Sequence, residues 1–356
     1  MEAVALVHPG WGSHGDAAPS DPARSTPGRL EINVAGATLG VPVYASRSLA
    51  ASDDQVRRLV VVIQGDRRRA ADYLDAAVAA AAAGSSDDAL IVAPHLRVAA
   101  DLAPSEQAGS ALYWSTAGWK EGALSRVRPW GRPSRLSSFA VLDALISAVV
   151  ESGRWRRLNG IRIVGHSAGG QFVQRYAAGS AIKDRLSVAG LRVRYVVANP
   201  SSYLYLSAER LDPITGEFRA LGLDDLAACP GADDYKYGLR RLNEYMAAST
   251  RAAIRGRYRE RSMTYVVGAL DTDPRDTRFD TTCAAQLQGE TRFARGVTFQ
   301  ASLEHLFGPG VRDRHRLVVV PEVGHDVRQI LRAPEVRDAL FGASPVAAMP
   351  AGSGVG

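Results

Sequence analysis

The segment IRIVGHSAGGQFVQRYA, residues 161–177, joins an apolar run to a helix-like run through one serine that is surrounded by glycines. The β-branched residues of I-R-I-V are typical of a buried parallel strand, and the residues after Gly170 can form a helix. Ser167 stands between the two runs in the pattern G-x-S-x-G, and Gly165 and Gly169 occupy the positions that must be small if the chain turns sharply. The segment therefore predicts a strand, a tight turn and a helix.

Ser167 has two interpretations. It can belong to an ordinary turn, because glycine supplies positive φ values and serine bonds its own backbone. It can also be a nucleophile, because the N–H groups at the start of the following helix favour negative charge that develops beside the hydroxyl. The strand before the serine and the helix after it favour the nucleophile.

The composition narrows the functions that the chain can have. Of its 356 residues, 46% are hydrophobic and 22% are charged, as in ordinary globular domains. The net charge is +6, but the basic residues are spread along the chain and the arginine clusters at 66–69 and 154–157 are short, so we expect no nucleic-acid binding. Because no apolar run approaches ~18 residues, we also expect no membrane span.

Short apolar runs alternate with helix-like segments along most of the chain. Two early runs, at 30–35 and 41–46, predict an antiparallel hairpin, and six later β-branched runs predict parallel strands. These later strands are expected at 58–64, 89–95, 161–164, 193–198, 263–268 and 316–321, with helices at 70–83, at 137–150 and after Ser167. The pattern predicts an α/β fold with a mostly parallel sheet of about eight strands and helices on both faces.

A single domain is expected over residues 30–341. Residues 1–29 and 342–356 are expected to form a flexible lead-in and a flexible tail. Residues 201–261 mix aromatic and polar side chains and break the alternation, so they predict a lid-like insertion over the carboxyl ends of the strands. The N-terminus lacks the positive region of a signal peptide, which favours a cytoplasmic location and leaves secretion open.

A serine hydroxyl needs a base to take its proton, and the base needs an acid that orients it. Three of the seven histidines follow the predicted turn and its helix. His305 lies in a helix-like segment and His315 enters a strand, whereas His325 follows a strand in V-G-H-D. We therefore predict that His325 is the base.

The acid is expected in A-L-D-T-D-P-R-D, which follows the strand at 263–268 and offers Asp271, Asp273 and Asp276. Asp271 lies three residues beyond Gly268, close enough to reach a neighbouring histidine loop. Asp273 precedes Pro274, which favours extended backbone and a turn-forming role. We therefore choose Asp271 over Asp273.

Catalysis by the serine also requires donors for the oxyanion and walls for a pocket. The Ala168 N–H is the first expected donor, and the Asp66 N–H, in the loop after the strand at 58–64, is the second. Candidate pocket walls are aromatic residues, for each of which core packing is an equally good explanation: Trp114, Trp119, Tyr203 and Tyr205.

The two cysteines, Cys229 and Cys283, lack the spacing of a metal site, so we expect no structural metal. They are either two buried thiols or one disulfide, and a disulfide would imply an oxidising compartment that the N-terminus does not support. We predict that they lie close in space, because each borders a segment on the side of the predicted site.

Four motifs, in this order and each after a predicted strand, resemble the α/β-hydrolase superfamily over roughly residues 30–341: I-Q-G-D-R-R, G-H-S-A-G-G, G-A-L-D and V-G-H-D. The chain looks most like the serine esterases related to polyhydroxybutyrate depolymerases, which share S-A-G-G and an acid three residues after a strand-end glycine. Many relatives have His-Gly where this chain has Gln64-Gly65.

The resemblance implies the α/β-hydrolase fold and a cofactor-independent serine hydrolase that cleaves carboxylic esters through an acyl-enzyme. Ser167, Asp271 and His325 would form its triad. Two alternatives stay open: hydrolysis of peptides or amides by the same triad, and a non-catalytic binding module on the same fold.

Overall fold

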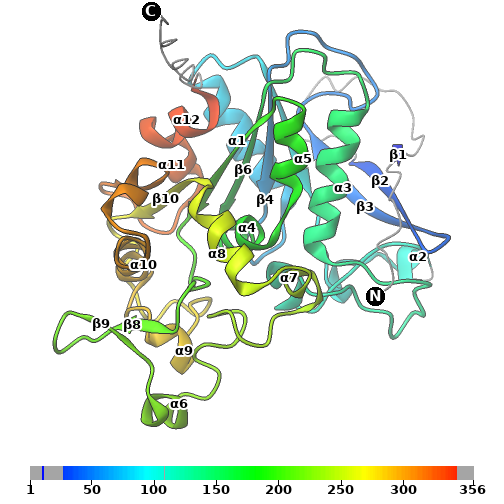
Figure 1. Ribbon diagram of the computed structural model, residues 1–356. Helices are drawn as coiled ribbons and strands as arrows, with labels where there is room; N and C mark the ends of the chain where they lie inside the picture. The colour runs from blue at the N-terminus through cyan, green and yellow to red at the C-terminus, as the bar shows by residue number, and fades with distance from the viewer. Residues whose placement is uncertain (1–9, 12–26, 108, 343–356) are drawn as a thin grey trace, which may run out of the picture.

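The computed structural model describes residues 10–11, 27–107 and 109–342 (Figure 1). Within these ranges, nine strands form one sheet in the order β1-β2-β3-β5-β4-β6-β7-β10-β11. Their bounds are β1 (Gly10–Trp11), β2 (Gly28–Val34), β3 (Ala37–Ala45), β4 (Arg58–Ile63), β5 (Ala89–Pro94), β6 (Gly160–His166), β7 (Arg192–Ala198), β10 (Ser262–Gly268) and β11 (His315–Val320). The strands from β5 to β11 in this order pair in parallel, and the pairs among β1, β2, β3 and β5 are antiparallel.

All eight expected strands are present, and the sheet has one strand more than predicted. The additional strand, β1, pairs Gly10 and Trp11 with Glu31 and Leu30 of β2. It falls inside the expected flexible lead-in, as does the start of β2 at Gly28. The rest of that lead-in, residues 1–9 and 12–26, lies outside the described residues, and so do residues 343–356 of the expected tail.

The central strands are buried on both faces, which explains their continuous apolar runs. Leu59, Val61 and Ile63 of β4 pack into the core on one face of the sheet. Val60 and Val62 pack into a second core on the other face. Because side chains alternate along a strand, each run of β-branched residues supplies both cores.

Helices cover both faces of the sheet, as the alternation predicted (Figure 1). One core contains residues of α1, α11 and α12, and the other contains residues of α3, α4, α8 and α10. The helix bounds are α1 (Ala70–Ala82), α2 (Pro104–Gln107), α3 (Ser138–Glu151), α4 (Ala168–Gly179), α5 (Ile182–Val188), α6 (Leu223–Ala228), α7 (Glu244–Ala247), α8 (Arg251–Arg259), α9 (Cys283–Gln286), α10 (Arg292–Phe307), α11 (Val327–Arg332) and α12 (Pro334–Phe341). Among the described residues, no helix has the length and apolar character needed to cross a membrane.

The segment 201–261 has two parts. Its second part, α7 and α8, belongs to the core, where Met246, Ile254 and Tyr258 are fully buried. Its first part contains α6 and a separate antiparallel pair, β8 (Glu209–Leu211) and β9 (Phe218–Ala220), which lie away from the large sheet in Figure 1. That the segment acts as a lid stays a prediction.

A disulfide anchors the projecting part of this segment. It joins Cys229, which follows α6, to Cys283, the first residue of α9, with a Cα–Cα distance of 5.7 Å. The prediction that the two cysteines lie close together is confirmed. The disulfide ties the projecting part to the chain that follows the loop of Asp271.

Candidate active site

Ser167 occupies the turn between β6 and α4. Its backbone has φ 59° and ψ −122°, a conformation that is strained for any residue with a side chain. The two glycines of the motif permit the turn, because a Cβ at Gly165 would lie 2.1 Å from the Gly169 carbonyl oxygen, and one at Gly169 would lie 2.3 Å from that of Ile63. The Ser167 N–H donates to the Ala198 carbonyl oxygen at 2.9 Å. The serine is thus held at the carboxyl end of the central strands.

Asp271 and His325 are in contact. The Asp271 Oδ2 atom lies 2.7 Å from His325 Nδ1, and Asp271 is 4% exposed. Gly268 lets their loops approach, because a Cβ there would lie 2.3 Å from the Val323 carbonyl oxygen. The carboxylate therefore bonds one ring nitrogen of His325, which fixes the orientation of the ring.

The other two aspartates of this loop have different partners. Asp273 has a side chain that is 62% exposed, and its Oδ1 atom accepts the Arg275 N–H at 2.9 Å, as in the turn expected before Pro274. Asp276 accepts the Arg278 N–H at 2.9 Å and pairs with Arg292 at 3.1 Å. Of the three candidates, Asp271 is the one that contacts His325.

Asn199, which the sequence reasoning missed, joins the loops of Asp271 and His325. It is fully buried at the end of β7, with its Oδ1 atom accepting the Gly268 N–H at 2.9 Å and its Nδ2 atom donating to the Gly324 carbonyl oxygen at 3.3 Å. Its position directly after an apolar strand, like that of Ser167, was a usable signal. We call Ser167, Asn199, Asp271 and His325 the serine–histidine cluster.

Arg292 was also missed, because α10 lies far from the motifs in sequence. Its guanidinium is buried and lies 3.3 Å from Asp271 Oδ1, on the carboxylate oxygen that does not bond His325. The same Nη1 atom pairs with Asp276, whose pKa would be raised by burial but is held below its usual value by the Arg278 N–H and the Arg292 charge. Arg292 therefore holds the Asp271 carboxylate from the side opposite His325.

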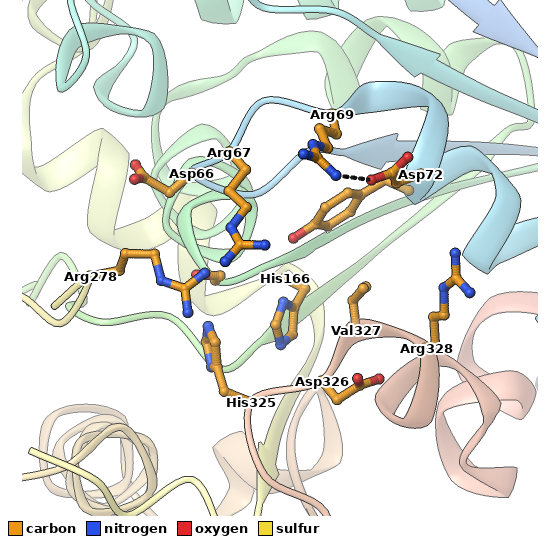
Figure 2. Close-up of a pocket in the computed structure, with 12 residues that line it drawn as sticks. Asp66, Arg67, Arg69, Asp72, His166, Arg278, His325, Asp326, Val327 and Arg328 are labelled. Atoms are coloured by element: carbon orange, nitrogen blue, oxygen red, sulfur yellow. Dashed lines mark ion pairs between the residues drawn. The ribbon is translucent and has the colours of Figure 1, made fainter. Parts of the chain in front are cut away.

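His166 stands beside His325, and their ring centroids are 4.5 Å apart (Figure 2). Burial, followed by the positive charges of His325, Arg292 and Arg278, lowers the pKa of His166 well below its usual value. His166 therefore stays neutral near pH 7. A neutral ring at this position does not oppose a positive charge on His325.

The loop after β4 carries the predicted oxyanion donor. Gln64 is fully buried and donates from Nε2 to the Leu96 carbonyl oxygen at 2.5 Å, which anchors the loop. In the part of the chain that the structure describes, neither the Asp66 N–H nor the Ala168 N–H donates to another group. Asp66 lines the pocket that contains Ser167 and His325, whereas Ala168 is 2% exposed and is not among the described residues that line it.

A single pocket contains Ser167 and His325 (Figure 2). Four arginines and three aspartates are among the residues that line it, which are Asp66, Arg67, Arg69, Asp72, Tyr73, His166, Ser167, Arg278, His325, Asp326, Val327 and Arg328. The side chain of Asp326 caps α11 by accepting the Gln329 N–H at 2.9 Å, so the helix begins two residues after His325. Sequence reasoning identified Asp66, Ser167 and His325 among these residues.

The four aromatic residues expected to wall the pocket do not line it. They are at most 1% exposed and belong to the core: Trp114, Trp119, Tyr203 and Tyr205. Tyr203, for example, stacks on Phe299 of α10 with ring centroids 4.4 Å apart. The prediction is corrected, because these large rings bury more apolar area in the core than a polar pocket offers them.

The remaining two downstream histidines lie elsewhere. His305 is on α10 and contacts Glu209 at 3.3 Å, and His315 is buried at the start of β11, with Nδ1 3.0 Å from the Tyr265 hydroxyl. Neither is among the described residues that line the pocket. The described residues contain no group of three or more His, Cys, Asp or Glu side chains that could hold a metal ion.

No protein-family model matches the chain, and no curated protein matches it. Several solved structures match the chain. LpqC, a poly(3-hydroxybutyrate) depolymerase from Bordetella parapertussis, is 21% identical with a TM-score of 0.57, over 90% of this chain and 93% of that one. Poly(aspartic acid) hydrolase-1 from Sphingomonas sp. KT-1 is 22% identical with a TM-score of 0.55, over 89% of this chain and 98% of that one. With the strand order and the Ser167 turn, these likenesses establish that the chain has the α/β-hydrolase fold.

Proposed function

We propose that the protein is a serine hydrolase that cleaves carboxylic esters through an acyl-enzyme. The observation that carries this proposal is the serine–histidine cluster: Ser167 on a strained turn shares a pocket with His325, whose Nδ1 atom is bonded to the buried Asp271. A nucleophile, a base and an orienting acid arranged in this way are the parts that acyl transfer requires.

In the proposed first step, Ser167 Oγ attacks the ester carbonyl carbon while His325 Nε2 takes the hydroxyl proton. The N–H groups of Asp66 and Ala168 would stabilise the oxyanion, and the start of α4 would add its positive dipole end. Asp271 keeps the Nδ1–H tautomer of His325 and stabilises the imidazolium. The neutral His166 ring adds no opposing charge beside it.

The leaving alcohol then receives the proton from His325, which leaves the acyl group on Ser167 Oγ. Water enters, His325 takes its proton, and the hydroxide attacks the acyl carbon. The acid departs when the proton returns to Ser167 Oγ. Each proton that leaves the serine or the water passes through His325, so one base serves both halves of the reaction.

The proposal also names the bond that is cleaved, which is an ester rather than an amide. LpqC is named as a depolymerase of a polyester, and the Sphingomonas protein as a hydrolase of poly(aspartic acid), whose backbone is an amide. The test is a panel of p-nitrophenyl acyl esters and aminoacyl p-nitroanilides with the purified protein. We expect hydrolysis of the esters; hydrolysis of the anilides alone would favour an amidase, and hydrolysis of neither would favour a binding module.

A further inference from the structure

Arginines surround the mouth of the pocket. Arg67 and Arg69 come from the loop after β4, Arg278 from the loop of Asp271, and Arg328 from α11, and all four are exposed. We call these four residues the arginine rim. Three separate elements thus place guanidinium groups around one opening.

The carboxylates of the pocket do not neutralise the whole rim. Asp66 pairs with Lys120 at 3.4 Å, and Asp72 pairs with Arg69 at 3.6 Å. Asp326 caps α11. Each pocket aspartate therefore already has a partner, and only one of these partners belongs to the arginine rim.

Arg67 and Arg278 line the same pocket as His325. In Figure 2 their side chains reach toward each other across the pocket, while the Asp66 carboxylate points away from both. Within the described residues the Arg67 guanidinium has no hydrogen bond or ion pair, and Arg278 has one at 3.4 Å, to an Asp276 that Arg292 also holds. Two guanidinium groups that face each other repel, and an anion bound between them offsets that repulsion.

The charge of Arg278 also acts on the interior of the pocket. It is one of the positive charges that, after burial, lower the pKa of His166. Because Arg278 lines the same pocket as Ser167 and His325, it can contact a group attached to a reacting ester.

We propose that Arg67 and Arg278 form an anion subsite, and that the substrate is an ester carrying a carboxylate a few bonds from the carbonyl that Ser167 attacks. This substrate class rests on the proposed function. A guanidinium presents a planar fork of donors that matches a carboxylate, and a bond between two charged groups is stronger than one between neutral groups. The subsite would hold the substrate by its anionic end and place the ester near Ser167 and His325.

The first test compares anionic and neutral esters of equal length. On the acyl side, p-nitrophenyl hemiadipate is compared with p-nitrophenyl hexanoate, and on the alcohol side 3-acetoxybenzoate with its methyl ester. We expect kcat/KM to favour the anionic member of at least one pair by ~10-fold, and the preference to shrink at high salt. Equal rates, or faster hydrolysis of the neutral member in both pairs, would overturn the subsite.

The second test removes the two charges. In the double variant Arg67→Gln/Arg278→Gln, the ratio of kcat/KM for the anionic ester to kcat/KM for the neutral ester should fall to about one. A general loss of activity lowers both values and cancels in this ratio. The matched control is Arg275→Gln, on the same loop as Arg278, with a side chain that is 91% exposed and outside the pocket. An unchanged ratio in the double variant, or an equal fall in the control, would contradict the proposal.

A binding measurement separates failure of the subsite from failure of the proposed function. Ser167→Ala is titrated with monomethyl adipate and with dimethyl adipate by calorimetry. The monoanion should bind more tightly than the neutral diester, and the preference should disappear when Arg67 and Arg278 are also replaced by Gln. Equal binding of the two ligands would overturn the subsite even if the protein hydrolyses esters, and preferential binding without any hydrolysis would support the subsite while the hydrolase proposal fails.

Discussion

The serine–histidine cluster and the arginine rim share one pocket but are built in opposite ways. In the cluster, Asn199 and Asp271 are buried and each makes at least two polar contacts that tie one loop to another. In the rim, the side chains are exposed, and neither Arg67 nor Arg328 makes a hydrogen bond or ion pair from its guanidinium within the described part of the chain. On the proposed function, the contrast predicts that the chemistry depends on buried contacts between loops, whereas the choice of substrate depends on exposed side chains.

This difference predicts how mutations will act in the two regions. A change in the cluster removes a reacting group or releases a loop that is held by close backbone contacts, so its effect on rate should be large for every substrate. A change in the rim leaves the backbone contacts in place, so its effect should depend on the charge of the substrate.

Ser167→Ala is expected to have the largest effect on rate. Loss of the nucleophile should lower kcat/KM for a neutral p-nitrophenyl ester by roughly 10⁶-fold, while the thermal unfolding midpoint stays near that of the parent protein. Steady-state kinetics and circular dichroism measure the two quantities. Substantial esterase activity in a folded variant would show that Ser167 is not the nucleophile.

The two aspartates of the loop after β10 provide a paired comparison. Asp271→Asn should lower kcat/KM by about 10⁴-fold, because an amide no longer holds the correct His325 tautomer. Asp273→Asn should change it little, since that carboxylate accepts a bond from its own turn. The measurement is kcat/KM of both variants with one ester. A large loss in Asp273→Asn with little change in Asp271→Asn would make Asp273 the acid.

Asn199→Ala tests whether a residue outside the reacting groups positions them. Loss of the bonds to the loops at Gly268 and Gly324 should lower kcat by roughly 10- to 100-fold with a smaller change in KM, because small displacements of a catalytic group are costly. Asn159→Ala, at an exposed position, is the control. A variant whose stability falls while kcat is retained would show a structural role only.

Cys229→Ser should have the smallest effect on rate, because neither cysteine is among the described residues that line the pocket. Its effect should appear in stability: a disulfide that spans 54 residues contributes about 4 kcal/mol in the chain-entropy model. Thermal unfolding with and without reductant measures the change. An unfolding midpoint that responds neither to the substitution nor to the reductant would contradict this role.

The sequence was sufficient for most of the fold and for the positions of Ser167, Asp271 and His325. Each of the three follows an apolar strand, and in a parallel sheet the carboxyl ends of the strands meet at one edge. Asp271 could be recognised from the sequence as the partner of His325, because the glycine three residues before it marks the close approach of two loops. These features depend on local pattern and strand order, which a sequence displays.

Other features depend on contacts that local pattern does not display. The aromatic residues Trp114 and Tyr203 are of the type that lines pockets and cores alike, and their burial is decided by which helices pack against them. Strand β1 has only two residues, too few for a periodic signal. Arg67 and Arg278 are two among many arginines, and only the folded chain places them in one pocket with His325 (Figure 2).

The most direct test of the proposed hydrolase is covalent labelling of the folded protein with a fluorophosphonate, followed by intact-mass and peptide mass spectrometry. The proposal predicts one phosphonyl group per chain, attached to Ser167, with labelling lost in Ser167→Ala and strongly slowed in Asp271→Asn but not in Asp273→Asn. If the folded protein is not labelled at all, or if the label is found on another residue and persists in Ser167→Ala, the serine–histidine cluster is not a hydrolase site.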